Sequence, residues 1–167
     1  MNIHLLFIML HRIRLRRPWI RRVVVGASDP SASTHESTVD VPDLSPLFID
    51  DRQIFPKDSR VRHQLSYTRR FNQPPHWLEA VRESAASAHL IVHCGVATLQ
   101  RVTLNELELP HIAMQPHPGD DQERTRVDLG DVWSPHNSVS LELSVPGDQF
   151  ETSLAWIGEV YIRIESS

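Results

Sequence analysis

The stretch HLIVHCGVATLQRVTLNELEL, residues 89–109, decides the fold of this chain. Leu90, Val92 and Cys94 recur at every second position of its first half. Side chains along a β-strand point alternately to opposite faces, so this spacing predicts a strand. Gly95 interrupts the alternation. The first half of the stretch therefore predicts one strand followed by a turn.

The second half of the stretch predicts a β-hairpin. The segment 99–104, LQRVTL, and the shorter segment 107–109, LEL, are separated by Asn105 and Glu106. Asn tolerates the positive φ that a two-residue hairpin requires, whereas Glu is a poor second turn residue. The hairpin prediction therefore depends on Asn105.

The same alternation recurs along the chain. Its clearest example is residues 138–145, where Val139, Leu141, Leu143 and Val145 are expected inside and Ser138, Ser140, Glu142 and Ser144 outside. Further strands are expected at 11–25, 66–71, 125–129 and 156–164, the last with Val160, Ile162 and Ile164 inward, and a short helix at 75–84. At least seven short strands and one helix predict an all-β fold, an antiparallel β-sandwich or jelly roll.

A length of 167 residues and a hydrophobic content of 40% fit one globular domain. Residues 1–11 begin with an apolar run that is too short to span a membrane. A secretory signal is the alternative, but the Arg cluster follows the apolar run instead of preceding it, and no A-x-A-like cleavage site follows. We therefore expect a leader that is disordered or the product of a mis-called start. Residues 12–167 form the expected domain. Within it, 26–64 is rich in Pro, Ser and Asp and predicts a long loop-rich excursion, loosely ordered at 31–38.

The net charge of −4 is unevenly distributed, with +5 over residues 1–70 and −9 over 71–167. Arg12, Arg14, Arg16 and Arg22 share one face of the expected strand 11–25, which Pro18 interrupts. Such a stripe either binds polyanions or protects a solvated edge strand. We favour the edge, because Pro18 cannot donate a ladder hydrogen bond, and expect no nucleic-acid partner.

Four segments follow one another along the chain: YTRRFNQP, HCGVATLQRVTLNELEL, RVDLGDVWSPHNSVSLELSV and IGEVYIRI. In this order they resemble the sugar-binding domain of β-galactosidase-like glycoside hydrolases, a galactose-binding-like jelly roll. The matching positions are Tyr67, Arg69 or Arg70, Phe71, Gly95-Val96, Val102, Leu104, Asn105, Asp128-Leu129, Asn137, Gly158 and Val160, with Trp19 at a common first-strand Trp position. The resemblance covers roughly residues 12–165.

The departures from this family fall in loops. Glu106 stands where the family's hairpin has Gly, and the loop after the hairpin begins at His111 with a different sequence. The family's catalytic acids lie in a separate barrel, so the resemblance implies a non-catalytic carbohydrate-binding module. The alternative is a protein-interaction or structural module on the same fold that has lost its sugar site.

The polar loop 111–124 is the best candidate for a ligand site, because loops at one end of a jelly roll are free to vary. Its His111, Asp120, Asp121 and Arg124 offer acceptors and a forked donor for sugar hydroxyls. Trp133 is the best candidate for an aromatic platform. The alternative for Trp133, as for Trp77 and Trp156, is packing in the core or its rim.

The sequence predicts no cofactor and no zinc site. His89 and His93 share a strand face but stand ~13 Å apart along it, too far for one metal. Asp120, Asp121 and Asp128 offer oxygens for a structural calcium, but their spacing is not that of an EF-hand, and we do not expect one.

Overall fold

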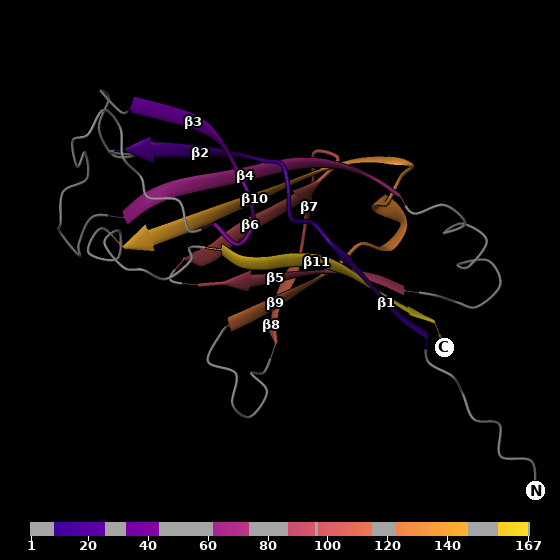
Figure 1. Cartoon of the computed structure of the whole chain (residues 1–167). Helices are drawn as coiled ribbons and strands as arrows, with labels where there is room; N and C mark the ends of the chain where they lie inside the picture. Colours follow the sequence, from indigo (N-terminus) through magenta and orange to yellow (C-terminus); the bar gives the residue numbers. More distant parts are fainter. Residues whose placement is uncertain are drawn as a thin grey trace, which may run out of the picture.

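The computed structural model describes residues 9–25, 33–43, 62–73, 87–95, 97–114, 123–146 and 157–166. Eleven strands and one 3-10 turn make up this part of the chain (Figure 1). The described residues include no helix with the length and apolar character needed to cross a membrane.

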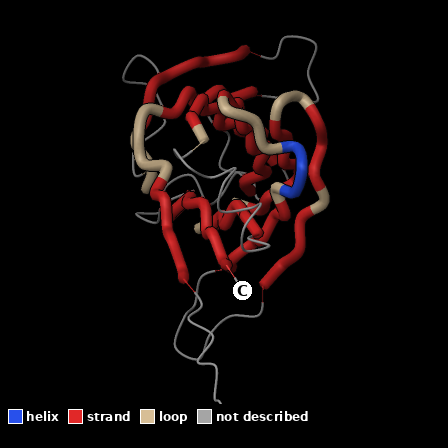
Figure 2. The backbone as a smooth tube through the Cα atoms, turned by 90° about the vertical axis from the view of Figure 1, so that its right-hand side faces the viewer, coloured by secondary structure: helices blue, strands red, loops and turns tan. Residues whose placement is uncertain are grey.

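The strands form two antiparallel sheets that face each other as a sandwich, as Figures 1 and 2 show, so the predicted fold class is confirmed. The five-stranded sheet has the order β1 (Met9–Arg14), β11 (Ile157–Ser166), β5 (Ser87–Cys94), β9 (Glu123–Asp128) and β8 (His111–Met114). The six-stranded sheet has the order β3 (Ser33–Val39), β2 (Trp19–Val25), β4 (Arg62–Asn72), β10 (His136–Pro146), β6 (Thr98–Leu104) and β7 (Leu107–Leu109). The 3-10 turn η1 (Gly130–Val132) joins β9 to β10.

The core lies between the inner faces of the two sheets. Val139, Leu141 and Leu143 of β10 are buried on one side, and Val160 and Ile162 of β11 are buried on the other. The expected inward residues of both strands are therefore confirmed. Ser144, which was expected outside, is also buried, and its hydroxyl accepts a hydrogen bond from Arg62 Nε. Burial of this apolar surface is the main stabilising term of such a sandwich.

The β6–β7 hairpin is present as predicted. Asn105 and Glu106 connect the strands with φ values of 52° and 70°. Positive φ at both central residues is the condition for a type I′ turn, whose twist matches that of the flanking strands. Glu106 is strained in this conformation because its Cβ approaches the backbone.

We expect Glu106→Gly to raise the free energy of unfolding by about 0.5–1 kcal/mol, because glycine adopts positive φ without a steric penalty. Denaturant unfolding would measure the change. Glu106→Ala is the matched control and should give no gain, since alanine retains the Cβ. Equal stabilisation by both variants would place the effect in the Glu106 side chain instead of its backbone.

Residues 11–25 are two strands, not one. β1 lies at the edge of the five-stranded sheet, as expected, but β2 lies between β3 and β4 in the other sheet. The chain crosses between the sheets around Pro18, which follows a cis peptide bond and offers no backbone N–H to either ladder. The strand also begins earlier than expected, because residues 9–11 of the presumed leader pair with β11.

The segment expected to be loose at 31–38 contains β3, so that prediction is wrong for residues 33–38. β3 pairs with β2 along its whole length although most of its side chains are polar and exposed. Likewise, the loop expected at 111–124 is shortened at both ends by β8 and β9. The helix expected at 75–84 lies outside the described residues.

A buried ionic cluster ties the segment after β3 to the six-stranded sheet. The Arg21 Nη1 donates to Asp43 Oδ2 at 2.9 Å, and the Tyr67 hydroxyl donates to the same oxygen at 2.7 Å. Burial, and then the charge of Asp43, raise the pKa of the Tyr67 hydroxyl well above its usual range, while Arg21 acts in the opposite direction. Tyr67 therefore remains a hydrogen-bond donor to this carboxylate.

His63 of β4 makes stability depend on pH. Its side chain is fully buried, and burial lowers the pKa of the imidazole below 6.5. The unfolded chain therefore takes up this proton at a higher pH than the folded chain. The contribution of neutral His63 to the free energy of unfolding is fully present above about pH 6.5. It is lost progressively as the pH falls below that value.

Melting temperatures recorded between about pH 8 and about pH 5 would test this dependence. We expect His63→Gln to flatten the acid side of the curve, whatever its effect on stability at neutral pH. The matched control is His136→Gln, which removes an exposed imidazole and should leave the slope unchanged. If the melting temperature of His63→Gln fell with pH as steeply as that of the parent, groups other than His63 would cause the pH dependence.

Candidate functional site

The outer face of the six-stranded sheet is polar, and its residues lie in cross-strand rows. One row consists of Ile20, Thr68, Ser140 and Thr103, from β2, β4, β10 and β6. The next consists of Arg22, Ser66, Glu142 and Arg101. In these rows the central strands carry mainly short hydroxyl side chains, and the flanking strands mostly longer ones. This difference in length hollows the middle of the face.

The first hollow lies where β10 meets the β6–β7 turn. It has a volume of about 750 Å³, within the range of small-molecule sites. The serines of β10 and their neighbours form its surface: Arg70, Thr103, Asn105, Glu106, Val132, Ser134, His136, Ser138 and Ser140. We use "first hollow" for this set.

Asn105 shapes the first hollow. Its Nδ2 donates to the Val132 carbonyl and to Asn137 Oδ1, both at 3.1 Å, and its Oδ1 accepts the Ser138 N–H at 2.9 Å. Asn137 is itself buried and accepts the Ser134 N–H. These bonds fix the segment after η1 as one wall. They also occupy the amide of Asn105, so its role is to position the wall.

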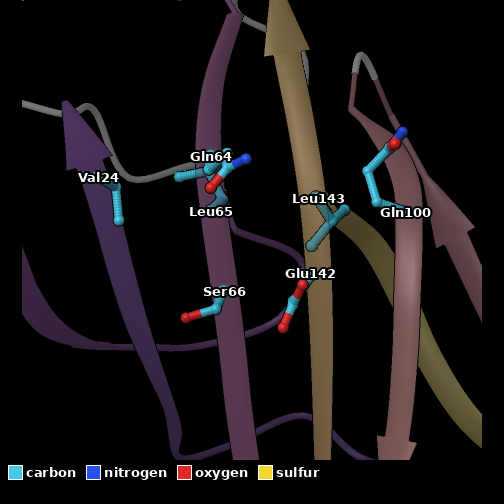
Figure 3. A pocket seen from close by; sticks show the side chains of 7 residues that line it. All are labelled: Val24, Gln64, Leu65, Ser66, Gln100, Glu142 and Leu143. Carbon is cyan, nitrogen blue, oxygen red and sulfur yellow. The ribbon is translucent and has the colours of Figure 1, made fainter. Parts of the chain in front are cut away.

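The second hollow lies further along the same face, with a volume of about 230 Å³. Figure 3 shows its residues on four neighbouring strands: Val24, Gln64, Leu65, Ser66, Gln100, Glu142 and Leu143. The register of β6 shifts between Glu142 and Leu143, which leaves Gln100 as an extra residue. A β-bulge of this kind re-aims a side chain, and here Gln100 lines the hollow.

The charges around the two hollows nearly balance. Arg101 pairs with Glu108 at 2.8 Å and lies 3.6 Å from Glu142, while Arg22 pairs with Glu36. Arg70 lines the first hollow, is exposed, and makes no hydrogen bond or ion pair with the described residues. Its guanidinium is therefore available to a ligand.

Of the described candidate site residues, Arg124 lies at one end of the five-stranded sheet, whereas His111 and Trp133 lie toward the other end. Arg124 of β9 lies beside His93 in the strand ladder, near one end of β5. The Leu129 backbone N–H donates to the Ala88 carbonyl near the other end of β5. Five residues of strand separate these ends by ~17 Å. The loop between β8 and β9 therefore leaves from the Arg124 end, and Trp133 follows the opposite end.

Trp133 lies in the core rim. Its side chain is 7% exposed and meets Phe71 edge-on, with ring centroids 6.4 Å apart. This placement favours the packing role over the platform role. His111 is exposed on the edge strand β8, and Arg124 lies on β9. Asp120, Asp121, Trp77 and Trp156 lie outside the described residues.

The described histidines do not form a metal site with their neighbours. No group of three potential metal ligands occurs within the described ranges. His89 Nδ1 lies 4.0 Å from Asp128 Oδ1, and His89 Nε2 lies 3.9 Å from Glu165 Oε2. The ring centroids of His93 and Tyr161 are 5.7 Å apart. Both imidazoles belong to β5 of the five-stranded sheet and are largely shielded from solvent.

The two hollows were missed from the sequence because their signal is indirect. The outward serines of residues 138–144 predict only a wet face. Recognising a depression requires knowing that Ser66 and Thr68 lie beside them on β4, which is a matter of strand order. The outward-facing Ser and Thr residues of β4 and β10 were the sequence signal that could have pointed to the hollows.

Comparisons with known proteins identify no family for this chain. No family model matches the sequence. No curated protein matches it significantly. Among solved structures, the chain is similar to part of a β-D-mannosidase from Dictyoglomus thermophilum, at 11% identity and a TM-score of 0.47. The match covers 92% of this chain and 22% of the mannosidase chain, so this chain spans about a fifth of that enzyme's length.

Proposed function

We propose that this chain is a non-catalytic carbohydrate-binding module whose ligand occupies the first hollow. The observation that carries the proposal is the polar surface of that hollow, open to solvent and floored by the hydroxyls of Ser138, Ser140 and Thr103. The ordered resemblance to a sugar-binding jelly roll supports it. Sugar hydroxyls need both donors and acceptors, and serine and threonine hydroxyls supply both.

Two longer side chains complete this polar surface. The Arg70 guanidinium offers forked donors, and the Glu106 carboxylate offers acceptors on the turn opposite. The Asn105 bonds hold the wall in place before a ligand arrives, which reduces the entropy lost on binding. A module of this kind binds and orients a glycan without breaking it.

The loop that contains Asp120 and Asp121 remains a second proposed location for the ligand. It leaves the five-stranded sheet, whereas the first hollow lies on the outer face of the six-stranded sheet. Variants therefore separate the two locations. Ser140→Tyr fills the first hollow, and Asp121→Ala combined with Arg124→Ala removes two of the polar side chains proposed for the loop site.

Calorimetric titration with a panel of galactosides, mannosides and plant or algal polysaccharides would test the proposal. We expect binding that Ser140→Tyr weakens by about tenfold or more, which corresponds to ~1.4 kcal/mol. The control Thr38→Tyr places the same ring on the exposed edge strand β3 and should bind as the parent does. Loss of binding only in the Asp121 and Arg124 variant would assign the site to the loop. No binding across the panel at millimolar ligand would refute the function.

The alternative, a protein-interaction module, is favoured by two exposed apolar residues. Leu107 is 53% exposed on the edge strand β7, and Ile112 is 61% exposed on the edge strand β8. An edge strand carries unpaired backbone N–H and C=O groups that can pair with another chain, and an apolar side chain beside them adds surface to such a contact. A partner captured by pull-down and lost in the Leu107→Ser, Ile112→Ser variant, with glycan binding absent, would favour this function.

A further inference from the structure

The two hollows lie in line along β10. Ser138 and Ser140 belong to the first hollow, and Glu142 belongs to the second. These are consecutive outward positions on one strand, so the two hollows are neighbours along the same face, although no residue lines both of them. From His136 to Leu143 they span ~23 Å at the rise of a β-strand. We call the combined depression the trough.

The sides of the trough differ in chemistry. On the β2 side, the outward residues are Ile20, which is 47% exposed, and Val24, which lines the second hollow, with Arg22 between them in an ion pair with Glu36. On the β6 side, Gln100 and Thr103 present polar groups. A pyranose ring has a hydroxyl rim and apolar C–H faces, so a surface that offers apolar side chains beside polar ones suits it.

The trough is also nearly neutral. Its ionisable lining consists of Arg70, Glu106 and Glu142, together with His136. Glu142 lies opposite Arg101, which offsets its charge. An anionic polymer would meet two carboxylates and one guanidinium, so the lining gives it no electrostatic advantage.

We propose that the trough binds the interior of an unbranched, uncharged polysaccharide, extended along β10, and not a terminal sugar. This inference rests on the proposed function and adds the ligand's length and charge. A straight depression over two hollows accommodates successive units of an extended chain. Each unit that enters the second hollow adds contacts that a monosaccharide in the first hollow cannot make.

Calorimetry with β-1,4-linked manno-, gluco- and galacto-oligosaccharides, from the monosaccharide to the hexasaccharide, tests the length dependence. We expect the affinity for the favoured series to rise with length by about tenfold or more and then level off once both hollows are filled. Binding of that series should be insensitive to added salt, since no charges pair. Affinity that is equal for all lengths would overturn the inference while leaving the proposed function intact.

Two matched variants locate the extra contacts. Ser66→Tyr fills the second hollow and should lower affinity for the hexasaccharide by about tenfold but leave short oligosaccharides unaffected. Ser140→Tyr should weaken every length, and Thr38→Tyr none. Equal loss at all lengths in Ser66→Tyr, or preferential and salt-dependent binding of polygalacturonate or chondroitin sulfate, would overturn the inference. Absence of binding to every sugar tested would overturn the proposed function itself.

Discussion

Asp43→Ala is expected to lower the free energy of unfolding by about 3–5 kcal/mol, because it removes one partner of a buried ion pair. The Asp43 carboxylate is fully buried and accepts hydrogen bonds from Arg21 and Tyr67. The variant leaves the Arg21 guanidinium, only 6% exposed, without its carboxylate. A charge in this position loses most of its hydration and has lost the compensating ion pair.

Denaturant unfolding of a small set of variants would separate the contributions. Tyr67→Phe removes one hydrogen bond and should cost about 1 kcal/mol. Arg21→Met combined with Asp43→Ala should be more stable than Asp43→Ala alone, because it removes the buried cation that has lost the Asp43 carboxylate. A loss below about 1 kcal/mol in Asp43→Ala would show that Arg21 is solvated in the folded chain.

Leu141→Ala is expected to cost about 2–5 kcal/mol, the range for truncation of a packed leucine. Leu141 is fully buried at the centre of β10, with Tyr67 of β4 and Val102 of β6 as its cross-strand neighbours. Because both neighbours belong to hydrogen-bonded strands, they have little freedom to move into the space left behind.

The control for this prediction is the adjacent residue. Glu142→Ala lies on the outer face of the same strand and should change stability by less than about 0.5 kcal/mol. Thermal unfolding of both variants would measure the difference. If Leu141→Ala melted within a degree or two of the parent, Leu141 would not occupy the core.

The sequence alone determined the regular strands and the fold class. The alternation over residues 138–145 predicts which side chains of β10 are buried, and all four apolar ones are. Asn105 predicts the hairpin, even though Glu106 is a poor turn residue. These predictions succeed because a period of two and a positive φ are local properties. Local sequence patterns therefore predict that a sandwich forms, but they do not predict which strands are neighbours.

Only the tertiary structure decided the position of β3, the break at Pro18 and the partner of Arg21. β3 has little apolar alternation and is held by its ladder with β2. Arg21 interrupts an apolar face in the sequence, and its counter-ion Asp43 comes from a segment that reads as loop. The candidate site depends on the same long-range order, because Ser66 and Ser140 are 74 positions apart in the sequence but lie on adjacent strands. Pairing between distant strands is set by the burial of whole faces, and no local pattern encodes it.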